Sequence, residues 1–135
     1  MGYTHYFTQL ADLTDEEFKK FSEGLSIIAN NPDNMCVLTK NEDSLVLDDL
    51  NNYGESMFIS KVKAMPTNSG IPAGFNFCKT GHTQYDTVIT ASLILLHSIA
   101  GEKFDISSDG SYQEDWAEGQ KHYEKTFSKV ALAPF

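Results

Sequence analysis

The stretch Tyr85–Ala100, YDTVITASLILLHSIA, decides the fold of this chain. Its apolar side chains cover nearly the whole circumference of a helix, which predicts a helix buried on all sides. These apolar residues are Val88, Ile89, Leu93, Ile94, Leu95, Leu96 and Ile99. Thr83 with Asp86 predicts the N-terminal cap, and Gly101 is well placed to follow the C-terminus. We therefore expect Tyr85–Ala100 to be the central helix.

Nearer the N-terminus, a second helix is predicted after Thr14. The segment Thr14-Asp15-Glu16-Glu17 is a capping box, in which the threonine hydroxyl and Glu17 bond each other's free amides. Apolar residues then recur at three- and four-residue steps and form one stripe, as in an amphipathic helix. The stripe consists of Phe18, Phe21, Leu25 and Ile28. Asn30-Asn31-Pro32 is expected to end the helix.

The other segments predict strands, turns and a third helix. The expected strands are Thr4–Gln9, Met35–Thr39, Ser44–Leu47, Met57–Val62, Phe75–Lys79 and Phe104–Ser108. Met65–Gly74, rich in proline and glycine, predicts a loop, and Ser111–Lys129 predicts a helix with Trp116, Tyr123 and Phe127 inward. The sequence thus predicts one α+β domain over residues 1–135, with a mainly antiparallel sheet of about four to five strands packed against three helices.

Composition and charge narrow the functional classes. Hydrophobic residues make up 41% and charged residues 21%, which is ordinary for a globular domain. The net charge is −9 and the chain contains no arginine, which argues against binding to duplex nucleic acid. The acidic residues are concentrated in the first half: residues 1–60 have a net charge of −8 and residues 61–135 have a net charge of −1. No apolar run is long enough for a membrane span, and the first residues do not resemble a signal peptide. We therefore expect a soluble cytoplasmic protein with reduced cysteines at Cys36 and Cys78.

The polar loop Lys79–Asp86 joins a predicted strand to the start of the central helix. Free amides and the positive end of the helix dipole favour an anion at such a position. The potential side-chain donors in the loop are Lys79, Thr80, His82 and Thr83. The spacing of a phosphate-binding Walker loop is absent. Two interpretations remain open, a site for an anionic ligand and a plain capped loop.

Two further segments carry polar and aromatic side chains. Tyr3-Thr4-His5-Tyr6 could stack a nucleobase, or it could be an edge strand with alternating faces. Ser107-Ser108-Asp109-Gly110 could contact a ribose, or it could be a simple turn after a strand. An exposed edge at Thr4–Gln9 or Met57–Val62 would favour a homo-oligomer through strand pairing.

Catalytic and metal motifs are incomplete. A Ser-His-Asp triad can be assembled from Ser108, His82 and Asp86, but many polar chains allow this. The histidines and cysteines do not have zinc-ligand spacing, and the acidic residues do not have the spacing of an EF-hand loop. The sequence therefore predicts no metal and no cofactor.

Three motifs together resemble a known family. They are the opening Met1-Gly2-Tyr3-Thr4-His5-Tyr6, Lys79-Thr80 followed by Tyr85-Asp86 before an apolar helix, and Ser107-Ser108-Asp109-Gly110 followed by Trp116. This combination is similar to a family of small uncharacterised proteins from phages, prophages and bacteria. Members often carry an arginine after Lys-Thr and a proline before Tyr-Asp, where this chain has Gly81 and Gln84. The resemblance implies a phage context, in which small proteins often counter host defence.

Three functions follow as hypotheses. The first is sequestration of a small phosphorylated nucleotide signal, such as a cyclic oligonucleotide or an ADP-ribose derivative, inside the infected bacterial host. The second is an acidic inhibitor of a nucleic-acid-binding host defence protein, which would use Glu42, Asp43, Asp48, Asp49 and Glu55. The third is an enzyme that degrades a nucleotide, with His82 as general acid or base. The expected ligand-binding residues are Lys79, Thr80, His82, Thr83, Tyr85, Asp86, His5, Tyr6, Ser108, Asp109 and Trp116.

Overall fold

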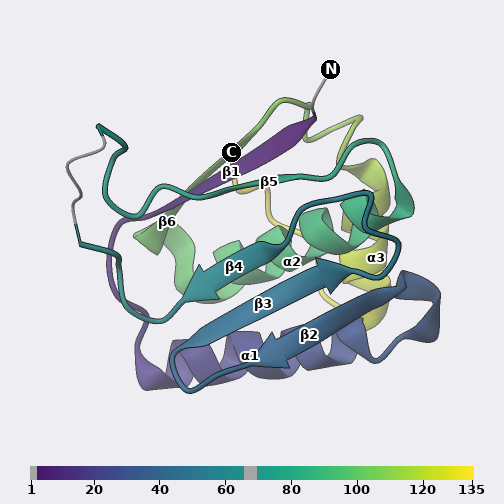
Figure 1. The fold of residues 1–135 in the computed structure, drawn as a ribbon. Coiled ribbons are helices and arrows are strands. Elements are labelled where there is room, and N and C mark those ends of the chain that lie inside the picture. The colour runs from purple at the N-terminus through teal and green to yellow at the C-terminus, as the bar shows by residue number, and fades with distance from the viewer. Residues whose placement is uncertain (1–2, 66–69) are drawn as a thin grey trace.

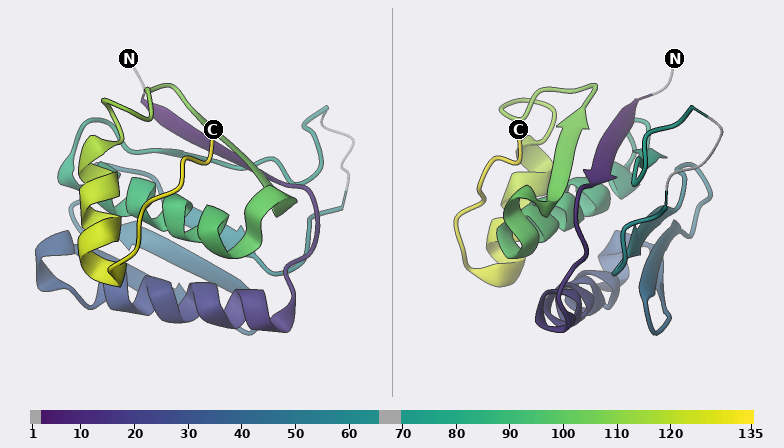
Figure 2. Two further views of the ribbon diagram at one scale, coloured as in Figure 1. Left: turned by 180° about the vertical axis from the view of Figure 1, so that it is seen from behind. Right: turned by 90° about the vertical axis from the view of Figure 1, so that its left-hand side faces the viewer.

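The computed structural model describes residues 3–65 and 70–135. The strands are β1 (Thr4–Gln9), β2 (Cys36–Lys40), β3 (Ser44–Asp49), β4 (Met57–Ser60), β5 (Phe77–Lys79) and β6 (Phe104–Ser108). The helices are α1 (Asp15–Ala29), α2 (Gln84–Ala100) and α3 (Ala117–Phe127), with short turns of helix at Pro32–Asn34 and Gly101–Lys103. Helix α2 lies at the centre, and the strands and the helices α1 and α3 are arranged around it (Figures 1 and 2). The predicted α+β class, with three helices, is confirmed.

Helix α1 forms where the local signals predict it. Thr14 Oγ1 accepts the backbone N–H of Glu17, and the Glu17 carboxylate accepts the N–H of Thr14, so the capping box is complete. Phe21, Leu25 and Ile28 are buried and face the rest of the domain. Asn30 caps the C-terminus, as expected from the asparagines before Pro32. Sequence-local hydrogen bonds and one apolar stripe are sufficient to specify this element.

Helix α2 is the centre of the fold, as predicted. It packs against α1, α3 and β6, and twelve of its residues are buried. Gly101 follows it with a φ of 55°, the left-handed conformation that favours glycine. Thr83 is the N-cap residue, as predicted, but its side chain makes no capping hydrogen bond. Its hydroxyl donates instead to the Thr80 carbonyl oxygen, because the loop turns back on itself before the helix begins.

The strands form two antiparallel sheets of three strands each, in place of the single sheet that the sequence suggests. One has the order β5-β1-β6 and the other the order β2-β3-β4. Their inner faces cover α2, with Phe7, Leu45, Leu47 and Ile59 almost completely buried. Strand β1 is central in its sheet, so the prediction that Thr4–Gln9 is an edge strand is wrong. Strand β4 does lie at an edge of its own sheet.

The last helix begins later than predicted, at Ala117 instead of Ser111. Residues 111–116 form a separate turn, in which the Ser111 carbonyl oxygen accepts the N–H groups of both Asp115 and Trp116. The Ser111 hydroxyl oxygen accepts the N–H of Glu114 and the Asp115 carboxylate accepts the Ser111 N–H, so these bonds close a turn instead of starting the helix. Trp116 and Tyr123 are buried, and Phe127 is half-buried against the core.

Two other expectations are resolved only in part. Phe75 and Asn76 run beside β1 but lie outside β5, which spans only Phe77–Lys79. The predicted loop Met65–Gly74 lies partly outside the described residues. Among the described helices, none is long and apolar enough to cross a membrane.

Candidate functional site

Three segments far apart in the sequence meet at the start of β1. In the sheet β5-β1-β6, His5 lies opposite Cys78 on one side and Ser108 on the other. The loop Lys79–Asp86 leaves β5 at this end, and the turn Ser108–Gly110 leaves β6 at the same end. The N-terminal strand therefore brings the predicted polar segments together.

His5 is the centre of a buried polar cluster and is fully buried itself. Its Nδ1 lies 2.8 Å from Ser108 Oγ, and its Nε2 lies 2.6 Å from Asp86 Oδ1. Ser108 Oγ also accepts the indole N–H of Trp116 at 3.1 Å and the backbone N–H of Gly110 at 3.0 Å. A hydroxyl has one proton and two lone pairs, so Ser108 donates its proton to His5 Nδ1. His5 consequently carries its own proton on Nε2 and donates it to Asp86.

Asp86 is the final acceptor of this cluster. Its Oδ1 also accepts the hydroxyl of Thr80, which is fully buried, at 2.5 Å. Asp86 lies in the first turn of α2, where the helix dipole favours a negative charge. The cluster therefore joins β1, the Lys79–Asp86 loop, α2 and the turn after β6 through side chains alone.

Tyr3 lies between the buried cluster and the surface. Its ring stacks on the exposed His82 ring, with the ring centres 4.2 Å apart, and meets His5 edge-on at 5.0 Å. Burial, followed by the charge of Asp86, raises the pKa of the Tyr3 phenol to about 12. Tyr3 therefore stays protonated, and with His82 it forms the outer wall of the cluster.

The side chains Ser108, His5 and Asp86 follow one another in the order of a serine-hydrolase triad. The triad assembled from the sequence contained His82. In the structure His82 stacks on Tyr3, and His5 takes the place of the histidine. Ser108 Oγ already accepts two N–H donors, and these donors draw electron density away from a nucleophile. Since His5 is also closed off from solvent, the arrangement favours a structural role for the cluster over catalysis.

The structure divides the predicted ligand-binding residues into two groups. His5, Thr80, Tyr85, Asp86 and Trp116 are buried, so a ligand at the surface does not reach them. Tyr85 points toward the other sheet, where its hydroxyl donates to the carbonyl oxygens of Leu47 and Glu55. The residues with exposed or half-exposed side chains are Tyr6, Lys79, His82, Thr83, Ser108 and Asp109.

Part of the accessible group lies on the outer face of the sheet β5-β1-β6, the face turned away from α2. The register places Tyr6 opposite Phe77 and Ser107, and Thr4 opposite Lys79. Because side chains alternate along a strand, Phe77 and Lys79 lie on the same face as Tyr6. The Tyr6 hydroxyl donates to Asp109 Oδ1 at 3.0 Å, and Asp109 Oδ2 accepts the N–H of Thr4 at 3.0 Å.

Three aromatic rings line up on this outer face. The ring centre of Phe75 lies 6.3 Å from that of Tyr6 and 5.9 Å from that of Phe77. Phe75 and Phe77 are both exposed, although phenylalanine has no polar group to satisfy at a surface. The sequence prediction missed both residues. The alternation Phe75-Asn76-Phe77-Cys78-Lys79 within a predicted strand, read beside Tyr6, was the signal that could have found them.

The acidic surface proposed for a protein inhibitor is smaller than the sequence suggests. Asp49 is buried, and its carboxylate accepts the N–H groups of Asn51, Tyr53 and Gly54. Glu55 accepts the N–H of Lys79. Within residues 3–65 and 70–135, no group of three or more histidine, cysteine, aspartate or glutamate side chains is placed to hold a metal ion.

The chain was compared with known proteins in three ways. The family models, the curated proteins and the solved structures each gave no match.

Proposed function

We propose that this protein binds a small phosphorylated nucleotide on the outer face of the sheet β5-β1-β6 and holds it without turnover. The observation that carries the proposal is the presence of Tyr6, Phe75 and Phe77 on the same exposed face as Lys79 and Asp109. Exposed aromatic rings on a sheet give a base a surface to stack on, worth about 1–3 kcal/mol per base.

The groups around the rings match the other parts of a nucleotide. Lys79 extends from the outer face, and none of the ion pairs among the described residues uses it, so its ammonium group is free to meet a phosphate. His82, three residues further along, is exposed but stacks on Tyr3, so Lys79 is the cation that this face offers. Each carboxylate oxygen of Asp109 has a remaining lone pair, which suits a ribose hydroxyl.

Charge limits the size of the ligand. The net charge of −9 repels polyanions, and Lys79 can offset only a small number of phosphate charges. A cyclic dinucleotide or an ADP-ribose derivative fits this limit better than an oligonucleotide. The resemblance to phage proteins suggests that such a ligand would be a host defence signal, which sequestration would keep from its receptor.

Binding without turnover is favoured by the state of the Ser108–His5–Asp86 cluster. The possible nucleophile accepts two N–H bonds, and the possible base is fully buried. Because the three side chains still follow the order of a triad, degradation of the ligand is the alternative that the experiment must distinguish.

The experiment is titration calorimetry with cyclic di-AMP, cyclic di-GMP and ADP-ribose, followed by chromatography of the recovered ligand. We expect at least one ligand to bind and to be recovered intact. Phe77→Ala should weaken binding about tenfold or more through lost stacking, and Lys79→Gln should weaken it and reduce its salt dependence.

The matched control is Phe58→Ala, because Phe58 is 44% exposed and Phe77 is 42% exposed, but Phe58 lies on the other sheet. Equal affinities of the wild type, Phe77→Ala and Lys79→Gln would refute the outer-face site. If the wild type alters the ligand and Ser108→Ala does not, the protein is a degrading enzyme instead.

A further inference from the structure

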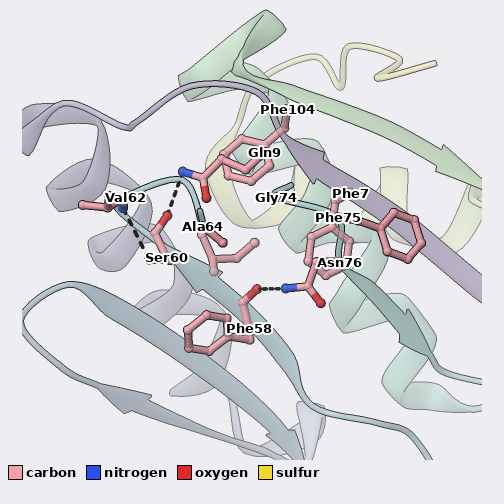
Figure 3. Close-up of a pocket in the computed structure, with 11 residues that line it drawn as sticks. Phe7, Gln9, Phe58, Ser60, Val62, Ala64, Gly74, Phe75, Asn76 and Phe104 are labelled. Carbon is pink, nitrogen blue, oxygen red and sulfur yellow. Dashed lines mark hydrogen bonds between the residues drawn. The ribbon is translucent and has the colours of Figure 1, made fainter. Parts of the chain in front are cut away.

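The two sheets diverge beside β4 and leave a cavity between them. At one end they are joined, since the Glu55 N–H donates to the Lys79 carbonyl oxygen at 2.7 Å. Further along, segment 74–76 stays with β1, where the N–H groups of Phe7 and Gln9 donate to the Asn76 and Gly74 carbonyl oxygens. The side chain of Asn76 spans the gap and donates to the Phe58 carbonyl oxygen at 2.7 Å. Beyond this bridge lies a cavity of about 310 Å³ (Figure 3).

Four phenylalanines are among the residues that line the cavity. Phe7 and Phe104 are buried and form part of its wall, while Phe58 and Phe75 are exposed at 44% and 38%. Among the described residues, those that line it include no lysine, aspartate, glutamate or histidine. A charged ligand would therefore lose its hydration without gaining a partner, which is strongly unfavourable. An uncharged flat ring could instead pack against several phenylalanine rings.

Polar groups of two kinds face this space. The amide nitrogen of Gln9 donates to the Ser60 carbonyl oxygen at 3.0 Å, and this bond fixes the side chain. In Figure 3 the amide oxygen of Gln9 points away from that bond, toward Ala64 in the cavity wall. It is therefore placed to accept a hydrogen bond from a ligand.

The free edge of β4 supplies donors. The carbonyl oxygens of Phe58 and Ser60 point away from β3, because they accept the side chains of Asn76 and Gln9. In an antiparallel strand the N–H and C=O groups of one residue point to the same side. The N–H groups of Phe58 and Ser60 consequently face the edge that borders the cavity.

We propose that this cavity binds a small, uncharged, planar heterocycle that carries a hydrogen-bond donor and an acceptor on one edge. The aromatic walls hold the ring, Gln9 accepts from the ligand, and the edge of β4 donates to it. This proposal does not depend on nucleotide binding at the outer face. The two sites share only Phe75 among the residues that carry them.

The test uses three bicyclic probes of similar size in protein-observed NMR titrations. Carbostyril is an uncharged lactam with a donor and an acceptor on one edge, quinoline has only an acceptor, and quinaldate adds a carboxylate. We expect carbostyril to shift the resonances of Phe7 and Phe104 and to bind about tenfold more tightly than quinoline, since quinoline cannot donate to Gln9. Quinaldate should cause no shift.

Ala64→Phe should fill the cavity from its exposed wall and weaken carbostyril binding more than tenfold. Ala133→Phe, at an exposed alanine in the C-terminal tail, is the matched control and should bind as the wild type does. Phe77→Ala and Lys79→Gln should also leave carbostyril binding unchanged, which separates this site from the outer face. Equal binding of all three probes, no shift with carbostyril, or unchanged binding in Ala64→Phe would overturn the proposal.

Discussion

At the scale of single residues, the polar cluster around His5 shows how a buried set of polar groups can be satisfied. Ser108 donates to His5, and His5 and Thr80 both donate to the same oxygen of Asp86. A buried acceptor that serves two donors stabilises the fold only while both bonds are formed, because an unpaired buried polar group is costly. Asp86 is therefore the residue on which the cluster depends most.

We predict different effects for two substitutions of Asp86. Asp86→Ala leaves His5 and Thr80 without their acceptor and should lower the free energy of unfolding by about 2–6 kcal/mol, about 1–3 kcal/mol for each unsatisfied donor. Asp86→Asn keeps an amide oxygen in the place of Oδ1 and should cost about 1 kcal/mol. Urea unfolding followed by circular dichroism measures both values. Equal losses in the two variants would show that the bonds to Oδ1 do not carry the stability.

His122 couples stability to pH. Its Nε2 lies 3.1 Å from the amide nitrogen of Asn34, which can only donate, so the imidazole is neutral and accepts at Nε2. Burial, together with the charge of Lys125, lowers the pKa of His122 below its ordinary value of 6.5. Between about pH 5 and about pH 7, His122 therefore binds a proton more readily in the unfolded chain than in the folded protein. The free energy of unfolding consequently rises with pH in this range.

The expected result is a melting temperature that falls as the pH decreases from about 7 to about 5, where the unfolded histidine becomes protonated. His122→Gln keeps an acceptor for Asn34 and has no titrating ring, so its melting temperature should depend less on pH. Differential scanning calorimetry of the two proteins at matched ionic strength makes the comparison. Identical pH dependence in both would exclude His122 as the source.

At the scale of elements, close helix packing depends on two glycines inside helices. Gly119 of α3 lies against Thr90 of α2, and Gly24 of α1 lies against Leu95 of α2. A Cβ atom at either position would overlap the facing side chain. Glycine is about 1 kcal/mol less favourable than alanine inside a helix. Close packing, and not helix propensity, therefore explains these two glycines.

Gly119→Ala should therefore destabilise the protein even though alanine favours a helix. Overpacking against Thr90 costs about 1–3 kcal/mol, which offsets the gain in propensity. We expect a net loss of about 1–2 kcal/mol in urea unfolding. Glu118→Ala, at the exposed position next to it, is the control and should change stability by less than about 0.5 kcal/mol. A more stable Gly119→Ala protein would contradict the predicted contact.

At the scale of the whole molecule, the two cysteines report on global unfolding. Both are free and buried. Burial raises the pKa of Cys36 to about 11 and that of Cys78 to about 12, with smaller effects from Asp49 and Glu55. The reactive thiolate is consequently scarce at pH 8 in the native state.

Labelling with a thiol-specific disulfide reagent should be slow in the folded protein and at least about a hundredfold faster in denaturing urea. Cys36→Ser and Cys78→Ser each leave one thiol, and both variants should show the same protection. Rapid labelling of either one without denaturant would show that the core opens locally at that cysteine.

The sequence by itself determined the elements whose signals are local. The capping box at Thr14 and the apolar stripe after it fixed α1, and the apolar circumference of Tyr85–Ala100 fixed the central place of α2. These predictions succeed because hydrogen bonds and hydrophobic periodicity within one segment are sufficient to specify a helix. The expectation failed at Ser111, where hydrogen bonds within the segment close a turn instead of starting the last helix.

Only the tertiary structure decided which of the polar candidate residues are buried and which are exposed. The sequence placed His5, His82 and Asp86 together as candidates, but strand pairing put His5 beneath the sheet and left His82 at the surface. It also put Phe75 and Phe77 beside Tyr6, from segments about seventy residues apart in the chain. The physical reason is that strand register, which determines the face of each side chain, is set by contacts between distant segments.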